Sequence, residues 1–247
     1  MPAVTESKFV CYMTWDDAPH LDEATKEDLL RSYPPHERDA RSRGEPALGS
    51  GAIYPIAEAD ILCEPFPIPA YWPRVYGLDV GWNKTAAVWL AYDRDTDTVY
   101  TYSEYGRGEA EPSVHAAAIK ARGDWIPGVI DPASRGRQQA DGRQLITMYR
   151  QAGLKVTEAD NAVEAGIYKI FERLSTGRLK VFSTLQGLRA EYRQYHRDEN
   201  GKVVKELDHY LDGWRYAILS GLSIAKVEPP KHSAVGRSPA GDRTAGY

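Results

Sequence analysis

The 247-residue sequence is poor in cysteine and has no long hydrophobic run. Its two cysteines, Cys11 and Cys63, are far apart and lack the spacing of zinc ligands, and nothing in their placement supports a disulfide. No apolar run approaches the roughly 20 residues of a membrane helix, and the N-terminus lacks a signal-peptide pattern. We therefore expect a cytosolic protein without a zinc site and without a membrane partner.

A phosphate-binding loop is also missing. Gly44 and Gly49 have the separation of the two glycines of that loop. However, Ser50 and Gly51 follow where a lysine and a serine or threonine are needed to reach phosphate and magnesium. The chain itself therefore carries no recognisable ATP motor.

What is present is the composition of a globular protein, with 42% hydrophobic and 27% charged residues. The net charge of −4 is unevenly distributed, because residues 1–60 contain 12 acidic and 6 basic side chains whereas residues 132–193 contain 6 and 11. A basic second half beside carboxylates suits a polyanionic substrate whose phosphates are held partly by metal ions. The alternative is that these cationic side chains simply solvate helix faces.

The hydrophobic pattern predicts an α/β fold. Three strands with tight connections, over 75–80, 86–92 and 98–105, predict an antiparallel meander. Helices then alternate with short strands, which predicts a parallel half of the same mixed sheet, flanked by helices. The further strands are expected at 128–130, 155–157 and 179–182, and the helices at 115–122, 145–154, 163–174, 185–195 and 208–224.

The same pattern divides the chain into three parts. Residues 1–74 contain a strand-like stretch at 9–15 and a helix that Asp22 caps, followed by Pro- and Gly-rich sequence. One strand and one helix cannot form a core, so we expect this part to be a connector from an upstream domain, with 53–71 running extended. Residues 75–226 form the main domain, and 227–247 are expected to be a disordered tail.

Asp79 interrupts a buried strand. It lies in Val75-Tyr-Gly-Leu-Asp-Val-Gly-Trp82, where the alternating apolar residues predict burial and Gly81 ends the strand. Burial of an unpaired charge costs several kcal/mol, so a cation at the strand end would explain the carboxylate. The alternative is an ordinary strand-end aspartate that hydrogen-bonds a turn.

Other acids also end or begin core elements. Asp131 follows the apolar Val129 and Ile130 and precedes Pro132, which forces the chain out of the sheet; a turn-forming role is the alternative. Asp208 and Asp212 are four residues apart on one face of the last helix. Asp208 is favoured as the helix N-cap or an outer metal contact, whereas Asp212 lies inside the helix, where a cap role is unavailable.

If the first and fourth strands are neighbours and the last helix crosses their ends, these acids converge. Carboxylates are the ligands that Mg²⁺ and Mn²⁺ prefer, together with water and substrate phosphates. Two such ions about 4 Å apart would activate water and stabilise the leaving oxygen of a phosphodiester. The residues thus predict phosphodiester hydrolysis.

Further polar residues have weaker support. Glu104 could be an auxiliary ligand or a solvated strand end. His196 and His209 flank the acids in sequence; His209, next to Asp208, could shuttle protons, and a surface histidine is the alternative. Several cations are placed after strand ends or on a predicted hairpin, where they could meet phosphates. These are Lys84, Arg135, Arg137, Arg143, Lys202 and Lys205.

Several motifs resemble those of the large terminase subunit of tailed bacteriophages, in particular its C-terminal nuclease domain. The most specific is Asp208-His-Tyr-Leu-Asp-Gly-Trp-Arg-Tyr-Ala217. The others are Gly77 to Trp82 with the following apolar strand, Val129 to Pro132, Thr176 to Phe182 and Glu191 to His196. Residues 15–21, 32–37 and 49–55 also resemble the segment that joins the ATPase motor of that family to its nuclease.

This resemblance implies a ribonuclease H-like fold and cleavage of concatemeric double-stranded phage DNA during genome packaging. It implies two divalent metal ions, Mg²⁺ or Mn²⁺, held by acids that correspond to Asp79, Asp131 and Asp212, with Asp208 nearby. The implied partners are DNA, an ATPase motor domain, a small terminase subunit and the portal, and the implied location is the cytoplasm of the host bacterium. The missing motor is a departure, so packaging by this chain alone is not implied.

Two other functions remain open at this point. An ATPase of the actin and sugar-kinase type also places an Asp-x-Gly between strands, but it needs a second such hairpin, which residues 130–226 lack. A non-catalytic module that docks on a portal or partner subunit, with residual acids, is the alternative from a different class.

Overall fold

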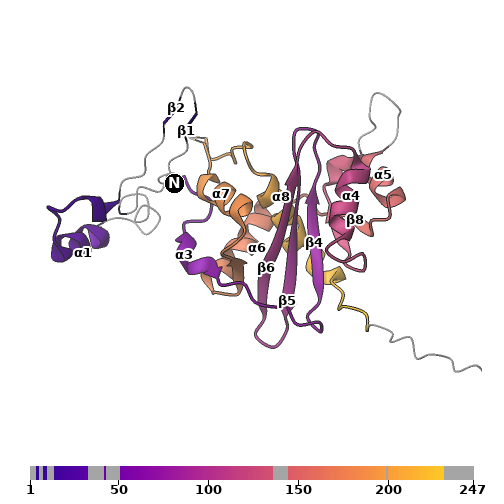
Figure 1. Ribbon diagram of the computed structural model, residues 1–247, viewed down its shortest axis with the longest axis horizontal. Coiled ribbons are helices and arrows are strands. Elements are labelled where there is room, and N and C mark those ends of the chain that lie inside the picture. Colours follow the sequence, from indigo (N-terminus) through magenta and orange to yellow (C-terminus); the bar gives the residue numbers. More distant parts are fainter. Residues whose placement is uncertain are drawn as a thin grey trace, which may run out of the picture.

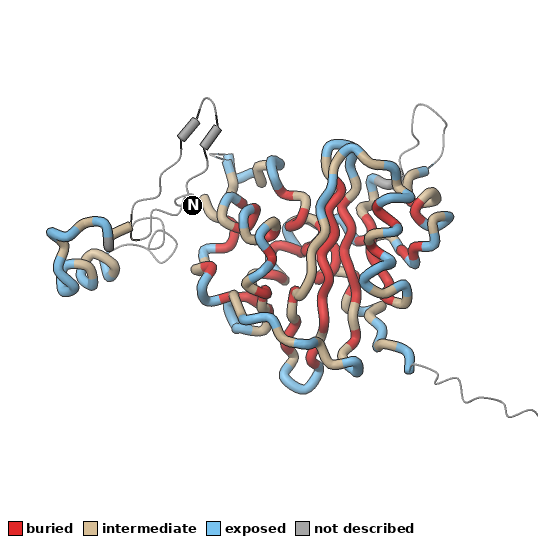
Figure 2. The backbone as a smooth tube through the Cα atoms, in the orientation of Figure 1, coloured by how far each residue is buried: buried red, intermediate tan, exposed pale blue. Residues whose placement is uncertain are grey.

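A computed structural model describes residues 4–5, 8–9, 14–32, 42, 51–135, 144–198 and 200–230. Its centre is a seven-stranded sheet with the strand order β3-β9-β6-β5-β4-β7-β8 (Figure 1). Helices cover both faces of the sheet, and the middle strands are buried along most of their length (Figure 2). The predicted mixed α/β sheet flanked by helices is confirmed.

The predicted meander forms the middle of the sheet. β4 (Arg74–Asp79), β5 (Thr85–Asp93) and β6 (Thr98–Arg107) pair antiparallel in sequence order. β5 is buried on both faces because helices cover both faces of the sheet, so its side chains alternate between two cores. Val88 and Leu90 face one core, whereas Ala87 and Trp89 face the other.

Four parallel strands extend the meander on its two sides. β7 (Gly128–Ile130) lies along β4, and β8 (Val156–Glu158) lies along β7. On the other side, β9 (Leu179–Phe182) pairs with β6, and β3 (Leu62–Cys63) pairs with β9. β3 lies in the stretch that we expected to run extended over the surface; instead a short helix, α3 (Glu58–Ile61), leads into it and the sheet gains an edge strand.

The helices form two layers. α4 (Pro112–Lys120) and α5 (Leu145–Gln151) pack on one face of the sheet. α6 (Val163–Ser175), α7 (Gln186–Gln194) and α8 (His209–Leu219) pack on the other. α4 begins three residues before the predicted start, because Pro112 occupies the first helical position, where its missing N–H costs nothing. The predicted last helix is divided into α8 and a 3₁₀ turn, η4 (Gly221–Ile224).

The described residues before position 51 contribute nothing to the two large hydrophobic clusters of this core. α1 (Glu23–Ser32) has no buried residue and lies apart from the sheet in Figure 1. Asp22 caps it as predicted, since its Oδ1 accepts the N–H of Thr25 at 2.8 Å. Upstream, β1 (Val4–Thr5) pairs with β2 (Lys8–Phe9). The predicted strand 9–15 is wrong at its end, where η1 (Trp15–Asp17) forms a 3₁₀ turn.

Two other sequence expectations concern single features. None of the described helices is long and apolar enough to cross a lipid bilayer. Cys63 carries a free thiol, whereas Cys11 lies outside the described residues. Most of the expected tail, from residue 231 onward, also lies outside them.

Candidate metal centre at the ends of the central strands

Asp79 and Asp131 end two neighbouring parallel strands. Leu78 on β4 is paired with Ile130 on β7, so the two acids occupy the next position on each strand. The N–H of Asp131 donates to the carbonyl of Leu78 at 3.0 Å, which ties the two strand ends together. The Asp131 carboxylate also accepts the N–H of Ala133 at 2.9 Å. Asp131 therefore stabilises the turn after β7, as the alternative interpretation predicted, and also lies beside Asp79.

Asp212 reaches the same end because α8 lies directly on β4. A Cβ atom added to Gly77 would be 1.9 Å from the carbonyl oxygen of Gly213, so only glycine allows this approach of helix and strand. Asp212 precedes Gly213 and lies in the first turn of α8. A contact between backbones thus fixes the third acid relative to the strand that carries Asp79.

In this structure each of the three carboxylates is bonded to a protein donor. Asp79 Oδ2 lies 2.8 Å from His209 Nδ1, and Asp131 Oδ1 accepts the Tyr216 hydroxyl at 3.2 Å. Asp212 Oδ1 accepts the Arg215 guanidinium at 2.8 Å. All three donors come from α8. Sequence reasoning treated His209 as a surface histidine or proton carrier and did not predict the role of Arg215.

The charges of the acids act on one another. Burial raises the pKa of Asp79, the hydrogen bond from His209 lowers it, and the charges of Asp212 and Asp131 raise it further. Burial also raises the pKa of the Tyr216 hydroxyl, with contributions from the same three carboxylates. The three carboxylates thus all act on one hydroxyl at this end of the sheet, and their joint role as ligands of a cation stays a prediction.

Arg215 is the buried cation of this site. Its side chain is 1% exposed, and its Nε has no hydrogen-bond partner within the described structure. A buried guanidinium is stable only beside an anion, and Asp212 supplies that charge from one turn away. The aliphatic part of the Arg215 side chain packs closely against Gly166 on α6, and this contact holds the side chain in place.

Asp208 is buried beside this group but is not the side-chain cap of α8. It precedes the helix without a capping hydrogen bond from its side chain. Burial and the charge of Asp212 raise the pKa of its carboxyl. The helix N-terminus is capped instead by Glu191 of α7, whose Oε2 accepts the N–H groups of Tyr210 and Leu211 at 2.6 and 3.2 Å. Asp208 therefore occupies the predicted N-cap position, but its side chain makes no capping hydrogen bond.

Glu104 has a similar structural role. Its two carboxylate oxygens accept the N–H groups of Gly187 and Leu188, each at 2.8 Å, at the start of α7. Anions are stabilised at this end of a helix. Glu104 is thus neither a solvated strand end nor free to act as an auxiliary ligand in this arrangement.

The predicted phosphate-binding cations differ in their surroundings. Lys84 is held by Glu191 at 2.8 Å and lies 4.3 Å from the centre of the Tyr210 ring. Lys202 and Lys205 are exposed near the predicted turn at Gly201, which the Arg197–Val203 bridge confirms. Arg135 lies in η3 (Pro132–Arg135), without a described side chain, and Arg137 and Arg143 lie outside the described residues.

The donor set fits hard divalent cations, but it is not arranged around one. Among the described residues, no group of three or more histidines, cysteines, aspartates or glutamates is poised to hold a metal ion. One oxygen of each of the three carboxylates is bonded to His209, Tyr216 or Arg215. Carboxylates remain the ligands that Mg²⁺ and Mn²⁺ prefer.

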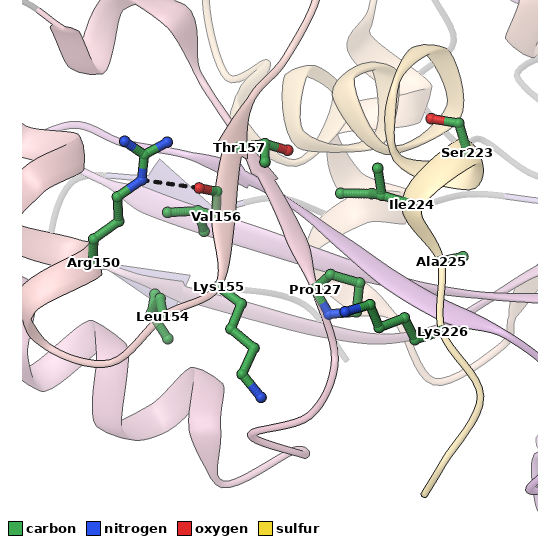
Figure 3. A pocket seen from close by; sticks show the side chains of 10 residues that line it. All are labelled: Pro127, Arg150, Leu154, Lys155, Val156, Thr157, Ser223, Ile224, Ala225 and Lys226. Atoms are coloured by element: carbon green, nitrogen blue, oxygen red, sulfur yellow. Dashed lines mark hydrogen bonds between the residues drawn. The ribbon is translucent and has the colours of Figure 1, made fainter.

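A hollow of about 700 Å³ lies at the opposite end of β7 and β8 (Figure 3). Pro127, which precedes β7, lies in its wall, whereas Asp131 follows the other end of that strand. Its lining contains three cations and no carboxylate. This hollow is therefore separate from the acidic site. It is lined by Pro127, Arg150, Leu154, Lys155, Val156, Thr157, Ser223, Ile224, Ala225 and Lys226.

A mixed sheet of this topology, with acids at the ends of adjacent strands, defines the class of ribonuclease H-like nuclease folds. The family model described as the terminase RNaseH-like domain matches residues 76–220. A second model, the N-terminal part of the T4likevirus-type terminase large subunit, matches residues 1–61. The chain belongs to the terminase large subunit family and contains its RNaseH-like domain, as the motifs predicted.

Curated relatives and solved structures agree with this assignment. The terminase large subunits of Salmonella phage P22 and Enterobacteria phage LP7 are each 36% identical to this chain, over 87% and 88% of its length. The chain spans about half of each relative, 45% and 48%. The P22 large terminase nuclease domain has a TM-score of 0.67 and 34% identity, covering 73% of this chain and 96% of that domain.

More distant structures show the same fold. The large terminase of the thermophilic bacteriophage D6E, in complex with ADP, has a TM-score of 0.61 at 23% identity over 85% of this chain and 54% of its own. The large terminase nuclease of thermophilic phage G20c with bound magnesium has a TM-score of 0.52 at 16% identity, over 69% and 98%.

Proposed function

We propose that this chain is a divalent-metal-dependent endonuclease that cleaves double-stranded phage DNA concatemers during genome packaging. The observation that carries the proposal is the meeting of Asp79, Asp131 and Asp212 at one end of the sheet, from two strands and one helix. Three carboxylates with few compensating cations form a site for hard divalent ions. Membership of the terminase large subunit family makes DNA the substrate to test first.

Asp79, Asp131 and Asp212 would hold two ions, Mg²⁺ or Mn²⁺, with Asp208 as a further nearby acid. When bound, such ions activate water and stabilise the leaving oxygen of a phosphodiester. The G20c nuclease, which shares the fold, has been solved with bound magnesium. In this chain, metal binding must compete with the protein donors, so Asp212 has to be shared between Arg215 and the cation.

The α8 donors orient the acids before metal binds. His209 fixes the Asp79 carboxylate, and its own pKa is raised by that hydrogen bond and by the charge of Asp79. Tyr216 holds Asp131 and Arg215 holds Asp212. Because all three donors project from one short helix, a shift of α8 would alter the three carboxylates together.

DNA affinity is proposed to come mainly from phosphate contacts. Lys202 and Lys205 are exposed. Burial raises the pKa of the nearby Asp208, and the charge of Lys205 opposes that rise. The further candidates for phosphate contacts are Lys84, Arg135, Arg137 and Arg143. If six phosphates are neutralised, affinity for duplex DNA falls by about 10³-fold between 50 and 200 mM salt.

We also propose the context in which this domain acts. The nuclease comprises residues 75–226 together with α3 and β3, which join its sheet. The residues before α3 connect it to an ATPase motor domain, and 227–247 form a tail. The proposed partners are that motor, a small terminase subunit and the portal, in the cytoplasm of the infected host. The D6E large terminase in complex with ADP supports the motor as a neighbour of this fold.

The direct test is cleavage of supercoiled plasmid DNA in manganese or magnesium by variants of each acid. Asp79→Asn, Asp131→Asn and Asp212→Asn each remove one negative charge without a change in size, and we expect each to lose at least about 10³-fold in rate. Asp95→Asn is the matched control, because Asp95 is exposed in the turn between β5 and β6, at the other end of the sheet. Undiminished cutting by the three variants would refute the proposal.

A second candidate function is a non-catalytic module that docks on the portal or another subunit. The observation in its favour is that each of the three acids is already bonded to a protein donor. Calorimetric titration with manganese separates the two functions. The nuclease proposal expects binding that Asp79→Asn weakens, whereas no binding at millimolar metal favours the docking module.

A further inference from the structure

Trp82 is exposed close to the proposed metal centre. It is 65% exposed and lies in the turn between β4 and β5, three residues after Asp79. Single exposed aromatic residues are common on protein surfaces and need no function. Two further observations distinguish Trp82 from an ordinary exposed aromatic residue. One concerns the backbone that carries Trp82, and the other concerns the hollow beside it.

The turn that carries Trp82 is held rigidly. The Trp82 carbonyl accepts the N–H of Glu109 at 2.8 Å. A Cβ atom on Gly108 would be 2.1 Å from the carbonyl oxygen of Asn83, so the turn and the segment after β6 are in backbone contact. The Thr85 hydroxyl closes the turn through Gly81. The indole is therefore presented on a fixed support, which reduces the ordering cost of a contact.

The indole forms one wall of a hollow of about 150 Å³. A cavity of this volume accepts a single aromatic ring. Pro112 and Leu145 add apolar surface, and the exposed Glu111 adds a carboxylate. Thr85 and Tyr149 also line the hollow but are almost fully buried. The lining therefore combines apolar surface with one exposed hydrogen-bond acceptor.

The charge of the hollow selects against phosphate. Its lining contains no lysine or arginine, and its charged group is the Glu111 carboxylate. A phosphate would be repelled, whereas a nucleobase is uncharged and planar. Adenine, cytosine and guanine also carry amino groups that donate hydrogen bonds to a carboxylate. Base stacking on an aromatic side chain is the usual way in which proteins hold unpaired bases.

The hollow and the acids share one end of the sheet. Asp79 pairs with Ala86, next to Thr85 of the lining. The carboxylates lie on the α8 face, whereas Tyr149 and Leu78 both belong to the core on the α4 and α5 face. DNA that lies across this end of the sheet can therefore reach both sites.

We propose that Trp82 and this hollow bind one unstacked nucleobase next to the phosphate that the acids cleave. The location beside a cleaved phosphate rests on the proposed nuclease function, but the binding itself does not. A paired base must leave the stack, which costs least at unpaired positions and ends. The site therefore predicts a preference for DNA with an unpaired base.

The test is equilibrium binding in EDTA, which separates binding from cleavage. Two labelled duplexes of equal length are compared, one fully paired and one with a single unpaired adenine. We expect the wild-type chain to bind the second about tenfold more tightly, Trp82→Ala to lose this preference and Trp82→Phe to keep most of it. Tyr71→Ala is the control, because Tyr71 is 69% exposed and precedes β4, at the other end of that strand.

A second measurement does not depend on the alanine variant folding. The difference in tryptophan emission between the wild-type chain and Trp82→Phe reports the indole at position 82, and we expect the unpaired duplex to quench it. A preference that persists in Trp82→Ala, or no difference in quenching, overturns the inference. Plasmid cleavage in manganese is scored separately, so wild-type chain that keeps the preference but cuts nothing contradicts only the proposed nuclease function.

Discussion

Gly77 on β4 and Gly213 on α8 are in backbone contact, and this contact positions Asp212 beside the strand that carries Asp79. Helix and strand usually approach with side chains between them. Here a Cβ on Gly77 would lie 1.9 Å from the Gly213 carbonyl oxygen, and one on Gly213 would lie 3.2 Å from the Gly77 carbonyl oxygen. The tighter restriction is therefore at position 77.

Gly77→Ala is expected to displace α8 and with it all three donors of the acidic site. Overpacking of this kind costs about 3 kcal/mol in the free energy of unfolding, measured by chemical denaturation. Plasmid cleavage should fall further than stability alone explains. Gly201→Ala is the control: its φ of 78° makes alanine cost about 1 kcal/mol, but nothing lies within 4 Å and cleavage should persist. Equal effects of both variants on cleavage would contradict this role of the contact.

The sequence predicted the centre of the fold well because its signals there are local. Alternating apolar residues in β4 and β5 and a short turn before β6 suffice to indicate a meander. β3 was missed because two residues carry no periodicity, and their strand conformation depends on β9, which lies more than 100 residues downstream.

The acids were predictable for a similar reason, since each stands at the end of an apolar element. Their protein partners were not. Arg215 is one turn from Asp212, but its complete burial depends on α6, which no local pattern reveals. Glu191 belongs to a recognisable motif, but its capping of α8 is a tertiary contact between two helices that the sequence does not reveal. Nor does any local pattern reveal that the hydroxyl of Tyr216, a core residue, donates to Asp131.

Metal binding should stabilise the folded chain. An ion that binds the native state at 100 times its dissociation constant adds about 2.7 kcal/mol. For a domain of this size that raises the melting temperature by about 5 to 10 °C, measured by calorimetry with and without manganese. Asp212→Asn should abolish the rise, and Asp95→Asn should keep it. A rise of equal size in both variants would place the ion elsewhere.

Lys84 and Glu191 should be energetically coupled. The Glu191 carboxylate is 4% exposed and accepts both the Lys84 ammonium and two N–H groups of α8. We expect a double-mutant cycle of Lys84→Met and Glu191→Gln to give a coupling of about 1 to 3 kcal/mol in unfolding free energy. A coupling near zero would mean that Lys84 is free to serve DNA phosphates.

His115 should make stability depend on pH. Its ring is buried on α4 and bonds the Tyr105 hydroxyl at 2.9 Å and the Ala110 carbonyl at 3.1 Å. Burial lowers the pKa of this histidine, the Ala110 contact raises it, and the charge of Arg107 lowers it. The folded chain therefore keeps His115 neutral at a pH where the unfolded chain already takes up a proton.

The sign follows from this difference. Above the unfolded pKa of about 6.5, both states are neutral and the contribution of His115 does not change with pH. As the pH falls below about 6.5, the unfolded state binds the proton more strongly, so the free energy of unfolding decreases until the folded pKa is passed. Denaturation between pH 5 and 8 should show a flatter profile for His115→Gln than for the wild-type chain. His20→Gln, which changes an exposed histidine, is the control and should leave the profile unaltered. If His115→Gln also leaves the profile unaltered, the buried ring of His115 does not cause the pH dependence of stability.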